Sequence, residues 1–110
     1  MEVQKIASLI ITASQRIDQG TKEIYKMAKN KAETEQQYRI ALAKQKLILK
    51  SEGMAISLIE DVARGTEDIA ALKFQRDYAE DMYKAAIESL RALRSELSGL
   101  QSLLRNQEEI

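Results

Sequence analysis

Apolar residues recur at alternating steps of three and four along two long segments of the chain. On an α-helix this spacing places them in one stripe, so it predicts a helix over about residues 2–50 and another over about 67–107. Strict heptads in the second segment are typical of coiled-coil packing. The first stripe consists of Val3, Ile6, Ile10, Ala13, Ile17, Gly20, Ile24, Met27, Lys31, Thr34, Tyr38, Ala41, Gln45 and Ile48. The second consists of Ile69, Leu72, Arg76, Ala79, Tyr83, Ala86, Leu90, Leu93, Leu97, Leu100 and Leu104.

Residues 51–66, SEGMAISLIEDVARGT, separate the two predicted helices and are expected to form an elbow. Gly53 can adopt the left-handed conformation that ends a helix. Ser57-Leu58-Ile59-Glu60 has the spacing of a capping box and predicts a short helix that ends at Gly65. We expect this helix to cover the end of the hairpin with Met54, Ile56, Ile59 and Val62.

Thr66 is placed to cap the following helix, and Glu67 and Asp68 fall in its first turn, where negative charge is favourable. The other interruption is Gly20, which either breaks the first helix or packs within it. A continuous helix is favoured because the apolar stripe passes through Gly20 without a slip. The predicted fold is therefore all-α: a long antiparallel, coiled-coil-like hairpin with a short helix in its elbow, forming one domain over residues 1–110.

Antiparallel pairing with Ile48 opposite Ile69 sets large residues against small ones. In this register Gly20 faces Leu97, and the remaining pairs are Ala13 with Leu104, Lys31 with Ala86, Thr34 with Tyr83, Tyr38 with Ala79, and Ala41 with Arg76. Such alternation suits two helices that pack at about 8–10 Å.

Apolar residues also occur outside both stripes: Leu9, Ile11, Ala28, Leu42, Leu47, Phe74, Tyr78, Met82, Ile87 and Leu103. A two-helix hairpin cannot bury two faces, so the pattern predicts a homo-oligomer, a dimer or larger, in the form of a helical bundle. The alternative is a third helix within the monomer if Gly20 breaks the first one.

Composition removes most catalytic chemistry, because the 110 residues contain no cysteine and no histidine. Asp77, Glu80 and Asp81 share one helical face, but such clusters are usually solvated, and no phosphate-binding loop or nucleophile motif is present. We therefore expect no enzymatic activity, no metal and no cofactor. No signal peptide is evident in Met1–Lys5 and no apolar run has the ~20 residues of a membrane span, so a cytoplasmic location without membrane association is expected.

Charge is distributed unequally although the net charge is zero. Residues 1–52 carry ten Lys/Arg and six Asp/Glu, whereas residues 53–110 carry seven and eleven. Lys44, Lys46 and Lys50 lie in the most basic region and are candidate phosphate contacts. A solvated face paired with the acidic half is favoured over nucleic-acid binding, since few aromatic residues are interleaved for base stacking.

The segments YRIALAKQKLILKSEGMAISLIEDVARG and LKFQRDYAEDMYKAAIESLRALRSEL carry a resemblance. They resemble small helical proteins of bacteriophages and prophages of Gram-positive bacteria, over roughly residues 36–104. The resemblance implies an accessory protein that acts in the bacterial host cytoplasm, and it brings no established activity with it.

Three classes of function are compatible with these features. The favoured one is a non-enzymatic protein that binds a host or phage protein and could inhibit a host defence protein. The alternatives are a nucleic-acid accessory factor in phage replication or recombination and a structural or assembly component of the particle. In the favoured class the elbow is expected to bind the partner through Met54, Ile56, Arg64, Glu67 and Asp68.

Overall fold

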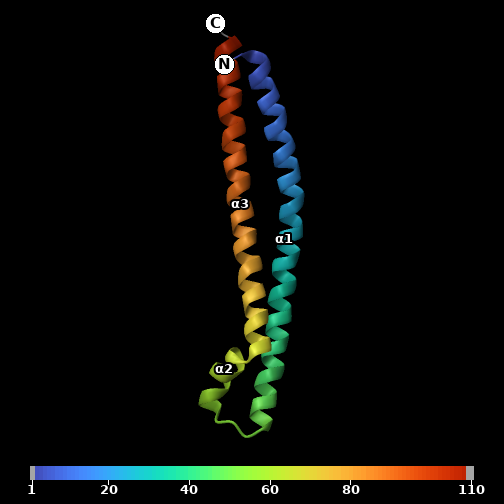
Figure 1. The fold of residues 1–110 in the computed structure, drawn as a ribbon, viewed down its shortest axis with the longest axis vertical. Helices are drawn as coiled ribbons and strands as arrows, with labels where there is room; N and C mark the ends of the chain where they lie inside the picture. The colour runs from blue at the N-terminus through green and yellow to red at the C-terminus, as the bar shows by residue number, and fades with distance from the viewer. Residues whose placement is uncertain (1, 109–110) are drawn as a thin grey trace. The chain divides into compact units, whose positions relative to one another are not determined.

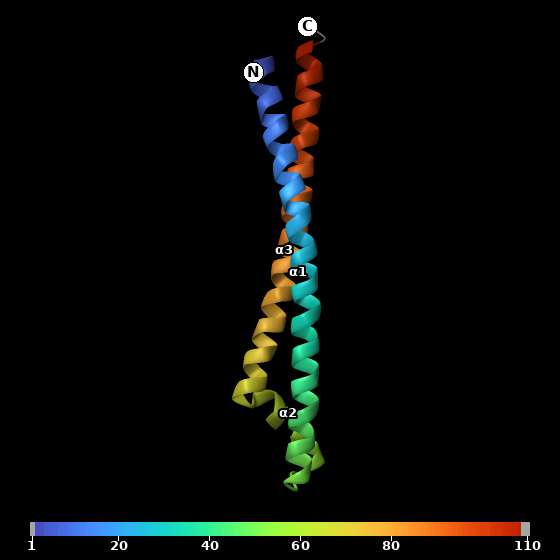
Figure 2. The same cartoon turned by 90° about the vertical axis from the view of Figure 1, so that its right-hand side faces the viewer.

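The computed structural model describes residues 2–108, and in this range the chain is helical with short connections. Helix α1 spans Val3–Ser51, α2 spans Ile56–Gly65 and α3 spans Glu67–Glu108. Helices α1 and α3 form the two arms of an antiparallel hairpin, and α2 lies in the connection between them (Figure 1). A second view shows the same order (Figure 2). The predicted all-α hairpin with a helix in its elbow is confirmed.

The contacts divide the chain into two compact units. Among the described residues, the terminal unit combines residues 2–26 with residues 84–108, and the elbow unit is residues 27–83. Each long helix contributes to both units. No helix among residues 2–108 is both long and apolar enough to cross a membrane.

In the terminal unit the predicted stripes form the contact between α1 and α3. Ile6, Ala13 and Leu90 are buried. Along α3, half-buried positions follow in heptad order: Leu93, Leu97, Leu100 and Leu104. Helix α1 continues through Gly20, so the prediction of an unbroken helix is confirmed. Val3, at the start of the stripe, is exposed.

The predicted register is displaced from the observed one. A Cβ atom built on Gly20 would lie 3.6 Å from Leu90 Cδ1, and no atom of Leu97 comes within 4 Å. The expectation that Gly20 faces Leu97 is therefore wrong. In the elbow unit, Lys31 lies over the Tyr83 ring rather than beside Ala86, which is a displacement of about one helical turn in the same direction.

The displacement originates at the elbow end of α1. Leu49 is buried there, whereas Ile48, which was expected to face Ile69, is 49% exposed. Leu49 packs against Ile59 and Ala63 of α2. The last turns of α1 therefore pack against α2 as well as α3. A register that pairs only α1 with α3 leaves out the contact with α2.

The core of the elbow unit is partly polar. Thr34, Tyr38, Ile69 and Ala79 are buried between the helices. Thr34 Oγ1 donates a hydrogen bond to the Asn30 carbonyl at 2.9 Å, which satisfies the hydroxyl inside the helix.

Gly53 ends α1 as predicted, with φ of 85°. The Gly53 N–H donates to the Lys50 carbonyl and the Met54 N–H donates to the Leu49 carbonyl, both at 3.1 Å. This pair of bonds is the Schellman arrangement, which usually includes an apolar contact between the residues at its two ends. Met54 packs against the cluster that contains Leu49, so that contact is present.

The predicted capping box at residues 57–60 is wrong. Helix α2 begins at Ile56, its N-cap is Ala55, and no side chain bonds to its first N–H groups. Ser57 is therefore already inside the helix. A short helix can begin without a side-chain cap when it is held by packing, and here Ile59 and Ala63 are buried against α1.

Thr66 occupies the predicted position between α2 and α3, but its side chain makes a different bond. Its carbonyl accepts the Ala70 N–H at 2.8 Å, as expected of an N-cap residue. Its Oγ1 instead donates to the Val62 carbonyl at 2.9 Å, at the end of α2. Glu67 and Asp68 lie in the first turn of α3, as predicted.

Candidate protein-interaction site

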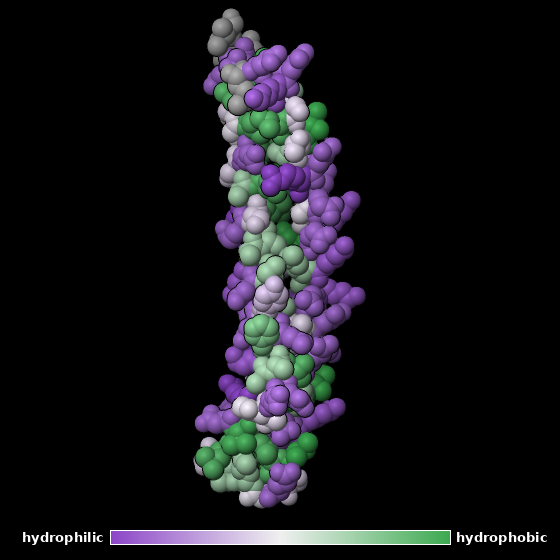
Figure 3. All heavy atoms as spheres, in the orientation of Figure 1, coloured by the Kyte–Doolittle hydropathy of each residue, from purple (hydrophilic) through white to green (hydrophobic). Residues whose placement is uncertain are grey.

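Helix α2 presents aliphatic side chains to solvent. Ile56 is 82% exposed, Leu58 54% and Val62 41%, and we call these three residues the elbow surface. The expectation that Ile56 and Val62 cover the end of the hairpin is wrong: Val62 lies beside the inward stripe of Ile59 and Ala63, and Ile56, although it is on the same side of the helix as these two residues, lies in the first turn and is exposed. Apolar atoms gather over the elbow in the space-filling view (Figure 3). Clustered exposed apolar side chains commonly mark binding surfaces.

The elbow surface stands on a packed base. Ile59 and Ala63 are buried with Leu49 of α1, and Leu42 and Met54 pack against them. The bonds of the Gly53 turn fix the point where α2 begins. Helix α2 is therefore held in one position on α1, and its exposed side chains are presented without further folding.

Two ion pairs flank this base on one side of α2. Glu60 accepts a hydrogen bond from Arg64 at 2.8 Å within α2, and it also lies 3.7 Å from the Lys46 ammonium of α1. Exposed pairs of this kind contribute about 0–1 kcal/mol each. Of the two, only the pair of Glu60 with Lys46 joins α2 to α1.

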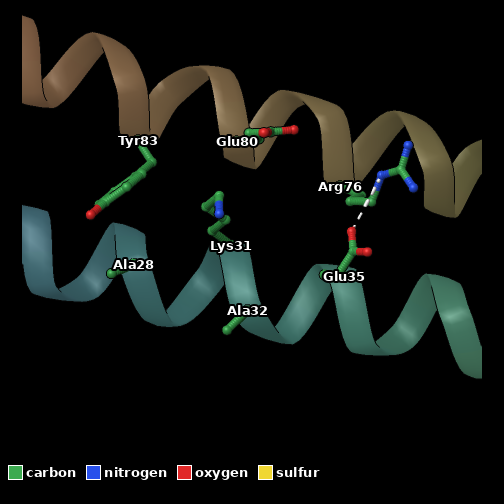
Figure 4. A pocket seen from close by; sticks show the side chains of 7 residues that line it. All are labelled: Ala28, Lys31, Ala32, Glu35, Arg76, Glu80 and Tyr83. Atoms are coloured by element: carbon green, nitrogen blue, oxygen red, sulfur yellow. Dashed lines mark ion pairs between the residues drawn. The ribbon is translucent and has the colours of Figure 1, made fainter.

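A shallow groove follows the same side of the hairpin beyond α2. Its part nearest to α2, about 380 Å³, is lined by Leu42, Ala43, Lys46 and Arg64 among others. The next part, about 670 Å³, is lined by small and charged side chains of α1 and α3 and by the ring of Tyr83 (Figure 4).

The wall of this groove contains a network centred on Arg76. The guanidinium lies 4.4 Å from the Tyr38 ring centroid and 3.5 Å from the Glu35 carboxylate. It also bonds to Asp77, which raises the pKa of Arg76. Asp77 accepts hydrogen bonds from Lys73 and Arg76, both at 2.8 Å, and these bonds lower the pKa of its carboxyl group.

Asp77 is thus held by two cations. Within residues 2–108, no group of three carboxylates is arranged to hold a metal ion. The contacts in the groove include the Glu35–Arg76 ion pair and the cation–π contacts of Arg76 with Tyr38 and of Lys31 with Tyr83.

The residues predicted to bind a partner are divided by the structure. Met54 is half-buried under α2 and belongs to the base, so it is not displayed. Ile56 is on the elbow surface, Arg64 is paired with Glu60, and Glu67 and Asp68 are exposed on α3. Leu58 and Val62 of the elbow surface were not among the predicted binding residues. At 100° per residue, Leu58 lies about 120° and Val62 about 80° from the midline between Ile59 and Ala63, which could have indicated their exposure once this inward face was known.

The predicted phosphate contacts are not equivalent. Lys44 and Lys50 are exposed, whereas Lys46 is half-buried and faces Glu60 of α2. One of the three positive charges is therefore already paired within the chain.

A second exposed apolar surface lies on α3. Phe74 is 69% exposed, Tyr78 58% and Met82 40%, and the rings of Phe74 and Tyr78 stack with centroids 6.1 Å apart. These residues follow one another at intervals of four, so they form a continuous strip that we call the α3 strip. On α1, Ile40, Leu47 and Ile48 are exposed.

The apolar residues outside the two stripes were predicted to lie outside the hairpin core, and most of them do. Leu42 is the clear exception, because it packs inward against the cluster beneath α2. Half-buried positions include Ala28, Ile87 and Leu103, while Leu9 and Ile11 are exposed.

The fold and this site define an all-α hairpin that carries exposed apolar surfaces. Comparison with protein family models, with curated proteins and with solved structures gives no significant match.

Proposed function

We propose that this chain is a non-enzymatic protein that acts by binding another protein through the elbow surface. The observation that carries the proposal is the exposure of Ile56, Leu58 and Val62 on a helix that packs on α1 through Ile59 and Ala63. Burial of these side chains by a partner would remove apolar area from water, which is favourable by about 25 cal/mol per Å². Because α2 is already ordered, little conformational entropy would be lost on binding.

The partner that suits this surface has an apolar groove. Leu58 and Val62 are four residues apart and share one face of α2, as do the anchors by which a helix docks into such a groove, while Ile56 is exposed in the first turn. Arg64 and the acidic Glu67 and Asp68 would lie at the rim, where charges affect specificity and association rate more than affinity. The resemblance to phage and prophage proteins favours a host or phage protein as partner, in the bacterial cytoplasm, with inhibition of a host defence protein as one form of the activity.

Nucleic-acid binding is supported less well. Binding through Lys44, Lys46 and Lys50 would require Lys46 to leave Glu60 or to serve both charges. Neutralisation of phosphates by the two exposed lysines alone would give weak binding that falls steeply with salt.

The test compares two isoleucine substitutions that make the same chemical change on exposed sites. Ile56→Asp alters the elbow surface, and Ile11→Asp alters a 58% exposed isoleucine of the terminal unit. Tagged proteins are expressed in the bacterial host, crosslinked and purified, and the bound proteins are quantified by mass spectrometry. We expect a specific protein to be retained by wild type and by Ile11→Asp and lost with Ile56→Asp.

Equal retention by both variants would refute the elbow surface as the binding site. A third variant, in which Lys44 and Lys50 are both replaced by Glu, separates the nucleic-acid alternative. If only this variant loses the retained protein, and the wild-type protein binds DNA at low salt, the proposal would be overturned.

A further inference from the structure

The elbow unit has two sides with different properties. One side carries α2 and the groove. On this side, the edge of α1 that lines the groove includes Lys46 and Ala32. At 100° per residue, Ile40, Lys44 and Ile48 lie on the opposite edge of α1, and Tyr78 and Met82 lie on the corresponding edge of α3. The side without α2 therefore carries exposed apolar residues from both long helices, and no segment among residues 2–108 covers it.

The charges of the two helices in this unit are opposite. Residues 27–51 of α1 contain six Lys/Arg and two Asp/Glu, whereas residues 67–83 of α3 contain two and five. If α1 packs against α1 of another molecule, two positive helices meet. If α1 packs against α3 of another molecule, every pair of neighbouring helices carries opposite charge, which favours association and suppresses the first arrangement.

We propose that the side without α2 binds a second copy of this chain, with α1 of each copy against α3 of the other. A two-fold axis parallel to the helices generates this arrangement, and within the elbow unit it gives a four-helix bundle in which all neighbours are antiparallel. Ile40 of one copy then lies level with residues 71–74 of the other copy, at the Phe74 end of the α3 strip.

Individual contacts follow from the heights of residues along the hairpin. The pairs Glu35–Arg76 and Lys31–Tyr83 are in contact within one copy. Lys44 is nine residues beyond Glu35 and thirteen beyond Lys31, so it lies at the height of residues 67–70 of α3. The two-fold axis preserves height, so Lys44 of one copy faces Asp68 of the other. By the same count, Glu33 of one copy lies at the height of Tyr78 of the other. The Tyr78 hydroxyl can then donate a hydrogen bond to the Glu33 carboxylate of the other copy.

The experiment measures the molecular mass of the full-length chain by sedimentation velocity across the micromolar range. We expect a dimer for wild type and a dissociation constant at least about tenfold higher for Tyr78→Asp, since the new carboxylate would lie opposite Glu33 of the other copy, where like charges oppose association. Ile56→Asp, on the elbow surface, should sediment like wild type, so this result is independent of the proposed partner binding. Tyr78 is largely exposed in a single copy, so its replacement should leave the helices folded. Circular dichroism of each variant checks this.

Charge exchange tests the orientation. Lys44→Asp and Asp68→Lys should each weaken the homodimer, because each places like charges opposite each other at two symmetric positions. An equimolar mixture of the two variants restores opposite charges at both positions of the heterodimer, so the mixture should dimerise more strongly than either variant alone. Intramolecular effects cannot produce recovery on mixing.

A wild-type chain that stays monomeric over this range would overturn the proposal. A dimer that is unaffected by Tyr78→Asp would also overturn it, because the interface would then lie elsewhere. Dimerisation without recovery in the mixture would exclude the α1-to-α3 orientation.

Discussion

Replacement of Gly53 by alanine isolates the backbone requirement of the elbow. Gly53 has φ of 85°, and a Cβ atom at this position would meet nothing within 4 Å. No steric clash with the rest of the protein contributes, so the cost is that of holding an L-residue in the left-handed region, about 1–2 kcal/mol. We expect Gly53→Ala to lower the free energy of unfolding by this amount.

The same substitution at Gly20 is the matched control and should have the opposite sign. Gly20 lies inside α1, and its added Cβ would lie 3.6 Å from Leu90 Cδ1, an ordinary van der Waals contact. Alanine is favoured over glycine in a helix interior by about 1 kcal/mol, so Gly20→Ala should stabilise the protein. A further control is Gly65→Ala, which adds a methyl group in open space at a residue without positive φ.

Urea unfolding followed by circular dichroism at 222 nm measures all three differences, at one protein concentration because an oligomer's stability depends on it. If Gly53→Ala is as stable as wild type while Gly20→Ala is stabilised, the elbow turn does not need its left-handed residue. A destabilised Gly20→Ala would instead show that α1 and α3 lie closer together at this point than the observed contact.

The remaining predictions concern the core and the charge network. Leu90→Ala should reduce the free energy of unfolding by about 2–5 kcal/mol, because Leu90 is buried between the arms; an unchanged urea midpoint would contradict this packing. The bonds from Lys73 and Arg76 lower the pKa of Asp77 below its ordinary value of 3.8, so their contribution to stability exists above that pH and is lost as the pH falls through the lower folded-state pKa. Asp77→Asn should therefore be less stable than wild type at pH 7, and the difference should vanish in acid; a difference that grows below pH 3.8 would refute this assignment.

The sequence predicts the arms of the hairpin well because their cores repeat. Positions such as Ala13, Tyr38, Ala79 and Leu90 are buried as their heptad positions require. The Gly53 turn is also predictable, since only a few residue types tolerate positive φ.

The sequence predicts the elbow less well because its packing is not periodic. Leu49 replaces Ile48 in the core only because α2 rests on that face of α1, and no repeat encodes this. The capping signals failed for a related reason, since tertiary packing holds α2 without a bond from Ser57. Exposure of Leu58 and Val62 depends on the rotation of α2, which is set by contacts between helices rather than by α2 alone.

The spacing of contacts along the chain also sets an order of folding. Leu49 and Ile59 are ten residues apart, whereas Arg16 and Glu96, an ion pair of the terminal unit, are eighty apart. Closing the longer loop directly would cost about 2 kcal/mol more chain entropy, so the hairpin should close from the elbow toward its ends. Leu49→Ala should then slow refolding, while Leu90→Ala should mainly accelerate unfolding. The Schellman turn at Gly53 would thereby act as the point from which the two arms join.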